Sequence, residues 1–328
     1  MGKAAYVGVQ NIARKVKNIY IGVDGIARKV KKGYVGVDGV ARLFYSAGAR
    51  FVSYSGAYTT SDVTVDGVAC TLYTLTSSGM LVVDGDGAQV WMCGGGGKGG
   101  NANLTWSGLA GASYNNIHTA YSGGGGAGGY IYSGEIPSGT HTVTIGAASG
   151  ATIITTASGE TFTAGQGGNN ATAGGTAGGR YRRYDTYGTI TTPGSGGAGV
   201  STYPFGLSEL YAHAAGGGSG SVLVNNYPAK ELCGGGYAGG TNGGNSGAQA
   251  SNYGTKASGG VRGGGAGGLV QIGGTGINGS KATFYGSGGG GGALYDTAYD
   301  YEDTYDKTSY HGSGAAGYQG VAYVLIPA

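Results

Sequence analysis

The stretch WMCGGGGKGGN, residues 91–101, joins a short apolar run to a glycine tract that contains one lysine. A P-loop needs Gly-Lys followed by Ser or Thr, but Lys98 is followed by Gly99. The glycines also match G-x-G-x-x-G, yet the following NANLTWSGLAGASYNN has neither the apolar spacing nor the capping box of a helix. In a chain with 79 glycines such matches arise by chance. We therefore interpret this stretch as a strand that leads into a glycine-rich scaffold.

The composition favours a folded but unusual chain. Glycine accounts for 79 of 328 residues and tyrosine for 27, while charged residues make up 11%, well below the roughly 25% of an average soluble protein. So few charges argue against the self-repulsion that keeps disordered segments open. Five prolines and irregular glycine spacing exclude collagen.

Charge, cysteine spacing and hydropathy further narrow the class of protein. Residues 1–46 carry a net charge of +7 and the remainder −4, but no nucleic-acid motif accompanies the basic segment, so we expect a partner-facing surface and no nucleic-acid partner. Cys70, Cys93 and Cys233 have unrelated spacings that suggest neither disulfides nor zinc. Without a signal-peptide core or an apolar run of about 18 residues, we expect synthesis in the cytoplasm and no membrane insertion.

Residues 5–46 contain a 14-residue repeat: AYVGVQNIARKVKN, IYIGVDGIARKVKK and GYVGVDGVARLFYS. Asp-Gly in two copies, with Gln10-Asn11 in the same slot of the first, tolerates the positive φ angles of a type I′ turn, so each copy is predicted to be a β-hairpin. Hairpins this small bury little surface alone, which predicts that residues 1–46 attach to another chain or copy. The aligned candidate attachment residues are Tyr6, Arg14, Tyr20, Arg28, Tyr34 and Arg42.

Residues 47–93 carry short alternating runs separated by Asp-Gly and Ser-Gly turns. This pattern predicts a small antiparallel β domain whose last strand, 89–93, runs into the first glycine tract.

Glycine concentrates after residue 93, in tracts such as 94–100, 123–129, 216–220 and 286–292. One such tract would be a flexible linker, but many in one region can pack side by side as polyglycine II, a left-handed helix with three residues per turn. Outward N–H groups then bond to carbonyls of adjacent helices. We predict a mainly β protein with almost no helix, in which residues 94–328 form a polyglycine II sandwich with tyrosine-rich loops. The C-terminal VAYVLIPA could cover its face.

Repeated glycine tracts with tyrosine-rich segments between them resemble the glycine-rich tail-fibre adhesins of bacteriophages, in which polyglycine II helices form a sandwich and the loops contact a bacterial receptor. The YVGVDGVAR unit resembles hairpin repeats at the start of phage tail-appendage proteins. The resemblance implies a virion tail protein that binds a host cell-surface glycan or protein receptor and other tail proteins, as a homo-oligomer, with a trimer possible. Those adhesins do not begin with such hairpins, so the mode of attachment is not implied.

Two segments, 180–214 and 293–311, concentrate tyrosine on a Gly/Ser/Asp background, as antibody paratopes do. With Trp106 from a lesser segment at 103–121, the candidate receptor-binding residues are Tyr181, Tyr184, Tyr187, Tyr203, Phe205, Tyr211, Tyr295, Tyr299, Tyr301, Tyr305, Tyr310 and Trp106. The same rings could instead cover the glycine tracts, or the two segments could pair, since the first is basic and the second acidic.

Catalytic and metal-binding patterns are missing from the sequence. The four histidines fit no H-E-x-x-H spacing, no serine lies in G-x-S-x-G, and the acidic segment lacks calcium-loop spacing. We expect no enzyme activity, cofactor or metal. The predicted function is a phage tail-fibre or baseplate adhesin. The alternatives are a purely structural virion or filament protein, whose tyrosines face other subunits, and, third, a capsule-degrading enzyme.

Overall fold

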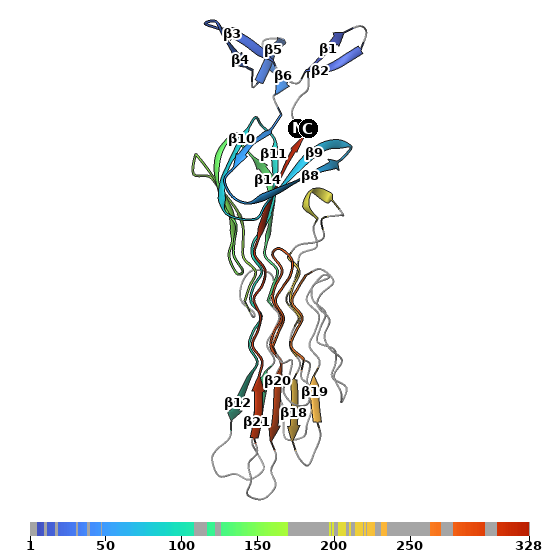
Figure 1. The fold of residues 1–328 in the computed structure, drawn as a ribbon, viewed down its shortest axis with the longest axis vertical. Helices are drawn as coiled ribbons and strands as arrows, with labels where there is room; N and C mark the ends of the chain where they lie inside the picture. Colours follow the sequence, from blue (N-terminus) through green and yellow to red (C-terminus); the bar gives the residue numbers. More distant parts are fainter. Residues whose placement is uncertain are drawn as a thin grey trace, which may run out of the picture.

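The computed structural model shows an elongated molecule, with three hairpins at one end, then a β sandwich, a glycine-rich region, and further strands at the other end (Figure 1). It describes residues 5–9, 12–16, 19–30, 32–37, 40–46, 48–107, 117–121, 126–169, 197, 199, 203–207, 210, 214–218, 220, 222–226, 231–234, 263–269, 278–298 and 307–327.

The N-terminal repeats are antiparallel hairpins, as predicted. They are β1 (Ala5–Val9) with β2 (Ile12–Val16), β3 (Tyr20–Val23) with β4 (Ile26–Lys29), and β5 (Lys32–Val37) with β6 (Val40–Ser46). Each closes through two residues, and in the second hairpin Asp24 and Gly25 have φ angles of 54° and 77°, as a type I′ turn requires. Within the described residues, each hairpin is a separate two-stranded sheet.

Two five-stranded antiparallel sheets form the sandwich. The first has the order β17-β16-β15-β10-β7, with β7 (Arg50–Tyr54), β10 (Gly79–Asp84), β15 (Gly139–Thr144), β16 (Thr152–Thr156) and β17 (Thr161–Ala164). The second has the order β14-β11-β22-β9-β8, with β8 (Tyr58–Val65), β9 (Val68–Leu75), β11 (Ala88–Cys93), β14 (Ile131–Ile136) and β22 (Val321–Pro327). Leu81 and Val143 of the first sheet share a buried cluster with Val90 and Val324 of the second.

The burial pattern explains why these sequences form these strands. In β10, Leu81 and Val83 are buried, whereas Met80 is exposed and Val82 is half-buried, the alternation expected when one face is packed. β22 lies between β11 and β9, and its residues 321–326 are all buried because both of its faces are covered. The run VAYVLI is therefore a central sheet strand, and our expectation that it covers the glycine tracts was wrong.

The sandwich uses chain from both sides of residue 93, where we expected a small β domain to end. β11 pairs with β14 and β22, which belong to the region assigned to the glycine-rich tip. The strands within 131–164 and at 321–327 belong to the same two sheets, and glycine tracts connect them along the chain. The division into domains at 1–46, 47–93 and 94–328 stays a prediction, although the sheets are not interrupted at residue 93.

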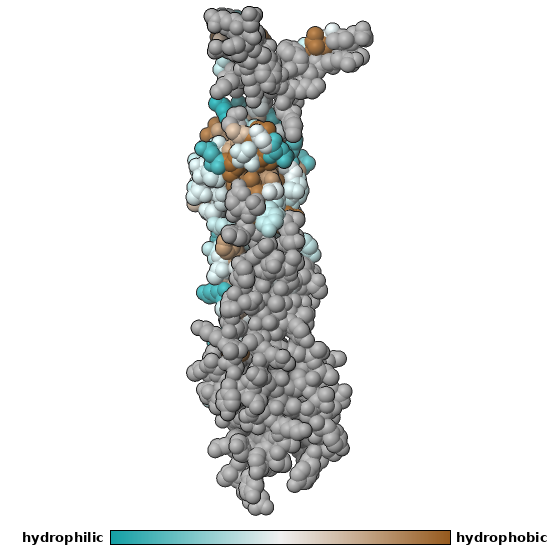
Figure 2. Space-filling view, turned by 90° about the vertical axis from the view of Figure 1, so that its right-hand side faces the viewer, coloured by the Kyte–Doolittle hydropathy of each residue, from teal (hydrophilic) through white to brown (hydrophobic). Residues whose placement is uncertain are grey.

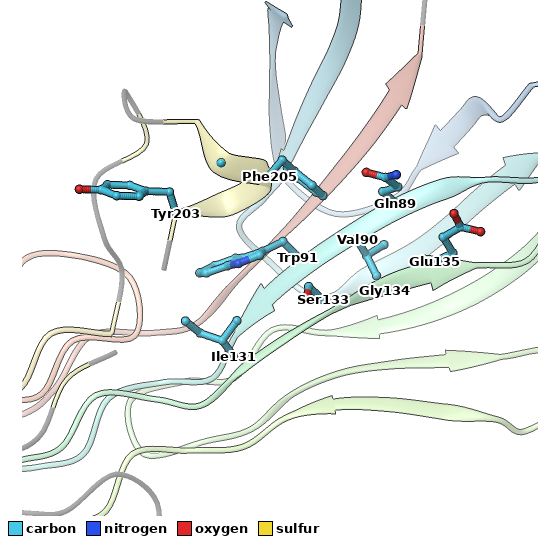
Figure 3. A pocket seen from close by; sticks show the side chains of 10 residues that line it. Gln89, Val90, Trp91, Ile131, Ser133, Gly134, Glu135, Tyr203 and Phe205 are labelled. Atoms are coloured by element: carbon cyan, nitrogen blue, oxygen red, sulfur yellow. The ribbon is translucent and has the colours of Figure 1, made fainter. Parts of the chain in front are cut away.

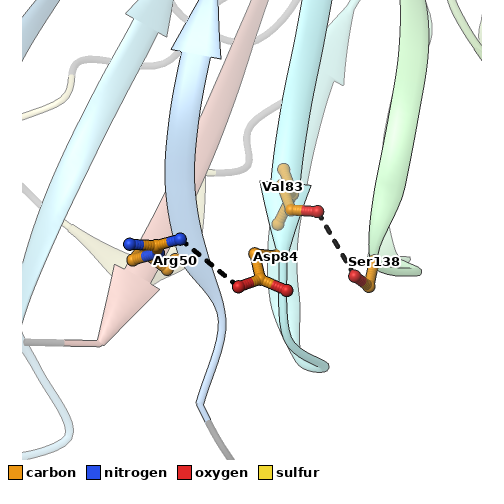
Figure 4. A network of polar contacts seen from close by, with 4 residues as sticks. All are labelled: Arg50, Val83, Asp84 and Ser138. Carbon is orange, nitrogen blue, oxygen red and sulfur yellow. Dashed lines mark hydrogen bonds and ion pairs between the residues drawn. The ribbon is translucent and has the colours of Figure 1, made fainter. Parts of the chain in front are cut away.

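Surface polar contacts are minor beside this core (Figure 4). Arg50 lies 3.4 Å from the carboxylate of Asp84, and the Ser138 hydroxyl donates to the Val83 carbonyl at 3.4 Å. Exposed ion pairs contribute about 0–1 kcal/mol, so the buried apolar side chains dominate the stability of the sandwich.

Below the sandwich in Figure 1, the tracts of the glycine region (described parts of 94–102, 126–130, 165–169, 214–220, 263–269, 278–293 and 312–320) run side by side. In tract 94–100, backbone N–H groups that are three residues apart donate to the same adjacent tract. Gly94 and Gly97 donate to Tyr130 and Ala127 at 3.0 and 2.8 Å, and Gly96 and Gly99 donate to Tyr318 and Ala315, both at 2.9 Å.

Tract 286–292 shows the same three-residue period. Gly288 and Gly291 donate to Ala215 and Gly218 at 2.8 and 2.9 Å, and Gly289 and Gly292 donate to Gly97 and Gly100, both at 2.9 Å. These glycines are buried, and a Cβ on most of them would overlap a backbone carbonyl of the adjacent tract. Backbone hydrogen bonds between closely spaced tracts thus take the place of a side-chain core here.

Polar side chains complete this network where tracts reach the surface. Lys98 is exposed, and its N–H donates to the Asn169 side-chain oxygen at 2.6 Å. The side-chain oxygens of Asn101 and Asn278 accept from the N–H groups of Gly314 and Ser313 at 3.0 and 2.8 Å.

Six strands lie at the end of the glycine region farthest from the sandwich (Figure 1). They are the hairpin β12 (Asn103–Ser107) with β13 (Ile117–Tyr121), and a sheet of order β19-β18-β20-β21 with β18 (Val222–Asn226), β19 (Glu231–Gly234), β20 (Leu294–Ala298) and β21 (Lys307–His311). β18 and β20 are parallel, and the other pairs are antiparallel. We call these six the distal strands.

Helix is confined, among the described residues, to one 3-10 turn, η1 (Pro204–Gly206). The prediction of a mainly β protein with almost no helix is confirmed for this part of the chain.

Candidate functional site

The distal strands hold three of the predicted receptor-binding residues. Tyr295 of β20 lies directly opposite Tyr310 of β21, and Tyr310 is 39% exposed. Trp106 of β12 lies opposite His118 of β13, and β13 runs beside β18. The fold therefore brings segments 103–121 and 293–311, far apart in sequence, to one end of the molecule.

Seven other predicted receptor-binding residues lie outside the described residues. They are Tyr181, Tyr184, Tyr187, Tyr211, Tyr299, Tyr301 and Tyr305.

Tyr203 and Phe205 lie elsewhere. Tyr203 immediately precedes η1, and Phe205 lies within it. This turn packs over the outer face of the second sandwich sheet, at the opposite end of the glycine region from Tyr295 and Tyr310. Phe205 and the buried Leu207 contact a cluster that includes Trp91 and Tyr323. Segments 180–214 and 293–311 therefore do not place all their aromatic residues on one surface.

A groove of about 510 Å³ lies between η1 and the outer face of β11 and β14 (Figure 3). The pairing of β11 with β14 explains why these side chains line the groove. Gln89 is opposite Glu135 and Trp91 is opposite Ser133, and residues two apart on a strand share a face. In Figure 3, Gln89 and Glu135 lie at one end, Trp91 at the other, and Phe205 stands over the strands. The groove thus combines an aromatic wall with three hydrogen-bonding side chains.

The backbone at Phe205 is unusual. Its φ and ψ angles are 52° and 24°, in the left-handed region that few residues other than glycine adopt. Gly206 follows with a φ of 75°. This turn directs the Phe205 ring toward the groove and the Leu207 side chain into the cluster beneath it.

Burial disfavours the charged forms of two side chains in the cluster beneath η1, Cys93 and Tyr323. It raises the pKa of the Cys93 thiol to about 12 and the pKa of the Tyr323 hydroxyl well above its ordinary value. A thiol that stays protonated is a poor nucleophile and a poor metal ligand, so Cys93 is a packing residue of the core.

The hairpin end exposes apolar as well as basic residues. Tyr20 and Tyr34 are 58% and 56% exposed, and Arg28 is exposed too. Tyr6, Arg14 and Arg42 lie at the matching positions of β1, β2 and β6. In all three hairpins the arginine is opposite a β-branched residue: Val7, Ile21 or Val35. The repeat therefore presents the same pairing three times.

Figure 2 shows that the described surface of the sandwich mixes apolar and polar residues. Exposed large apolar side chains there include Val52, Val68 and Met80, and the hairpins add Ile21 and Ile26.

Within the described ranges, no group of three or more His, Cys, Asp and Glu side chains is placed to hold a metal ion. In the same part of the chain, no helical segment has the length and apolar character of a membrane span.

Sequence reasoning missed the groove. The alternation of Gln89, Trp91 and Cys93 could have indicated an outward row on one strand. The pairing with Ser133 and Glu135, about forty residues away, and the return of η1 over that face carry no local sequence signal.

Comparisons of the chain with protein-family models, curated proteins and solved structures found no match.

Proposed function

We propose that this protein is a bacteriophage tail-fibre or baseplate adhesin. Its N-terminal hairpins attach it to other virion tail proteins, and its distal strands and the loops they carry bind a host cell-surface glycan or protein receptor. It acts without catalysis, cofactor or metal, assembles as a homo-oligomer, and is made in the host cytoplasm before incorporation into the tail.

One observation carries this proposal: the aromatic distal strands lie at the opposite end of the molecule from the basic hairpins (Figure 1). An adhesin needs this separation, because one end must remain on the particle while the other reaches the cell. Tyr310, paired with Tyr295, presents the rigid amphipathic ring that recognition surfaces favour.

We further propose that the glycine tracts run as polyglycine II helices and act as the rod between these ends. The three-residue period of the hydrogen bonds from 94–100 and 286–292 supports this, because polyglycine II has three residues per turn. Bonds in several directions around one tract also fit a lattice of such helices better than a flat sheet, where partners lie on two sides only.

The test is binding of the fluorescently labelled full chain to host cells. The full chain is needed because a fragment from residue 94 would lack β7–β11 of the sandwich. We expect the Tyr295→Ala/Tyr310→Ala variant to lose at least tenfold in affinity, as hot-spot tyrosines do. Tyr130→Ala, an exposed tyrosine beside the sandwich, is the matched control. Equal binding by both variants, with unchanged host range after exchange of 180–214 and 293–311, would refute the adhesin proposal.

A structural virion or filament protein is the second candidate. It is favoured by the apolar side chains exposed on two hairpins, Tyr20, Ile21, Ile26, Tyr34 and Val35, which another subunit could cover. Protection of the distal strands from protease in assembled particles would support this candidate over the adhesin.

A further inference from the structure

We propose that the groove between η1 and β11–β14 is a second binding site, which takes a neutral saccharide. The inference goes beyond the adhesin function, because it concerns the side of the sandwich and uses none of the distal strands.

The polar side of the groove matches sugar hydroxyls. Gln89, Ser133 and Glu135 lie on one face of two paired strands, and within the described residues none of these side chains hydrogen-bonds to the protein. A carboxamide and a hydroxyl both donate and accept, while a carboxylate accepts strongly. A ligand with several hydroxyl groups, each donor and acceptor, can bond all three.

The apolar side matches the C–H face of a sugar ring. Phe205 stands over the strands beside the polar row, and the nearly buried Trp91 closes one end of the groove. Tyr203, 37% exposed, extends the aromatic surface. A groove with aromatic side chains on one side and hydrogen-bonding side chains on the other matches a pyranose, whose ring has an apolar C–H face and polar hydroxyl groups.

Charge selects a neutral ligand. Among the described residues that line the groove, Glu135 is the one carboxylate, and none is Lys or Arg. An anionic ligand such as a phosphate or a uronic acid would meet like charge without a compensating cation. The volume of about 510 Å³ lies within the usual range for small-molecule sites.

The backbone at Phe205 is an independent observation. Glycine would adopt a φ of 52° without strain, yet the chain has phenylalanine there. Strained residues concentrate at ligand sites, where the surrounding structure holds a side chain in one position. Here the strain holds an aromatic ring over the groove.

Trp91 provides the assay. The chain has two tryptophans, so in Trp106→Phe the remaining indole reports on the groove alone. This variant is titrated with glucose, galactose, N-acetylglucosamine and rhamnose, up to tens of millimolar, while its emission is followed. We expect a saturable change with at least one of the four sugars. No saturable change with any of them would overturn the proposal.

Variants in the same background then locate the site. Glu135→Ala should raise the half-saturating concentration about tenfold, and Phe205→Leu, which keeps apolar bulk but removes the aromatic face, should raise it as well. Glu160→Ala, another exposed glutamate, in the turn between β16 and β17 of the first sheet, is the control and should leave it unchanged. Glucuronate should bind more weakly than glucose. Equal binding by Glu135→Ala and Glu160→Ala, or tighter binding of glucuronate, would overturn the proposal.

Glu135 is exposed, so its variant tests the groove even if Phe205→Leu destabilises η1. Loss of host-cell binding through the distal strands would leave the titration unchanged, which keeps failure of the two proposals distinguishable.

Discussion

Replacing Gly97 by alanine tests whether close backbone packing holds the glycine region together. The Gly97 N–H donates to the Ala127 carbonyl at 2.8 Å, and its own carbonyl accepts from Gly289 at 2.9 Å. A Cβ would lie 2.6 Å from the carbonyl carbon of Gly168 and 2.9 Å from the oxygen of Gly167, inside the 3.0 Å that real Cβ atoms essentially never cross. It would lie closer still to the Gly168 oxygen. These are backbone atoms, so the tracts must separate.

The cost follows from this separation. Overpacking a close-packed interior destabilises by about 1–3 kcal/mol, and each weakened hydrogen bond adds up to about 1 kcal/mol. We expect a loss of about 3 kcal/mol, which lowers the Tm by roughly 4 °C in a chain of 328 residues. Thermal denaturation followed by circular dichroism measures it.

Gly48→Ala is the matched control, because a Cβ at Gly48 meets nothing within 4 Å. This variant should stay within about 0.5 kcal/mol of the wild type. If Gly97→Ala and Gly48→Ala have the same Tm, the glycine region does not depend on close backbone contact and the reasoning fails.

Three further predictions follow from single buried or bridging groups. Burial lowers the pKa of His141, so the stability that its neutral form provides is present above the unfolded pKa of about 6.5 and is lost as the pH falls below it. Urea denaturation should therefore show a larger drop between pH 7 and pH 5 in the wild type than in His141→Gln, and equal drops would contradict this. The Cys93 thiol, with its pKa raised to about 12, should resist a thiol reagent at pH 8 in the folded protein and react in urea; equal rates would show that Cys93 is accessible. Asn169→Ala removes the acceptor of the Lys98 N–H and of the Ser149 hydroxyl, at 2.6 and 2.8 Å, and should cost about 1–2 kcal/mol in the same thermal assay. An unchanged Tm would rule out a structural role for this side chain.

Local signals in the sequence predict local structure well. Asp24-Gly25 and Asp66-Gly67 mark turns, and the second residues have φ angles of 77° and 76°. The strand that precedes the first glycine tract also lies where the alternation places it. These features depend on neighbouring residues and on the few conformations that their backbones allow.

Long-range pairing is what the sequence could not supply. β22 joins β9 and β11 from more than 200 residues away, and its apolar run is equally compatible with a cover for the glycine tracts. The same limit applies to the candidate sites. Tyrosine-rich segments indicate recognition, but only the fold separates Phe205 from Tyr310 and brings Phe205 and Glu135 to the same groove.

The central claim, that the distal strands face the host, is tested most directly by electron microscopy of phage particles decorated with antibody fragments. One fragment is raised against residues 294–311 and a second against residues 1–46. The account predicts the first label at the outer tip of a tail fibre or baseplate, farther from the tail axis than the second. A first label seen only on disrupted particles, or closer to the tail axis than the second, would contradict it.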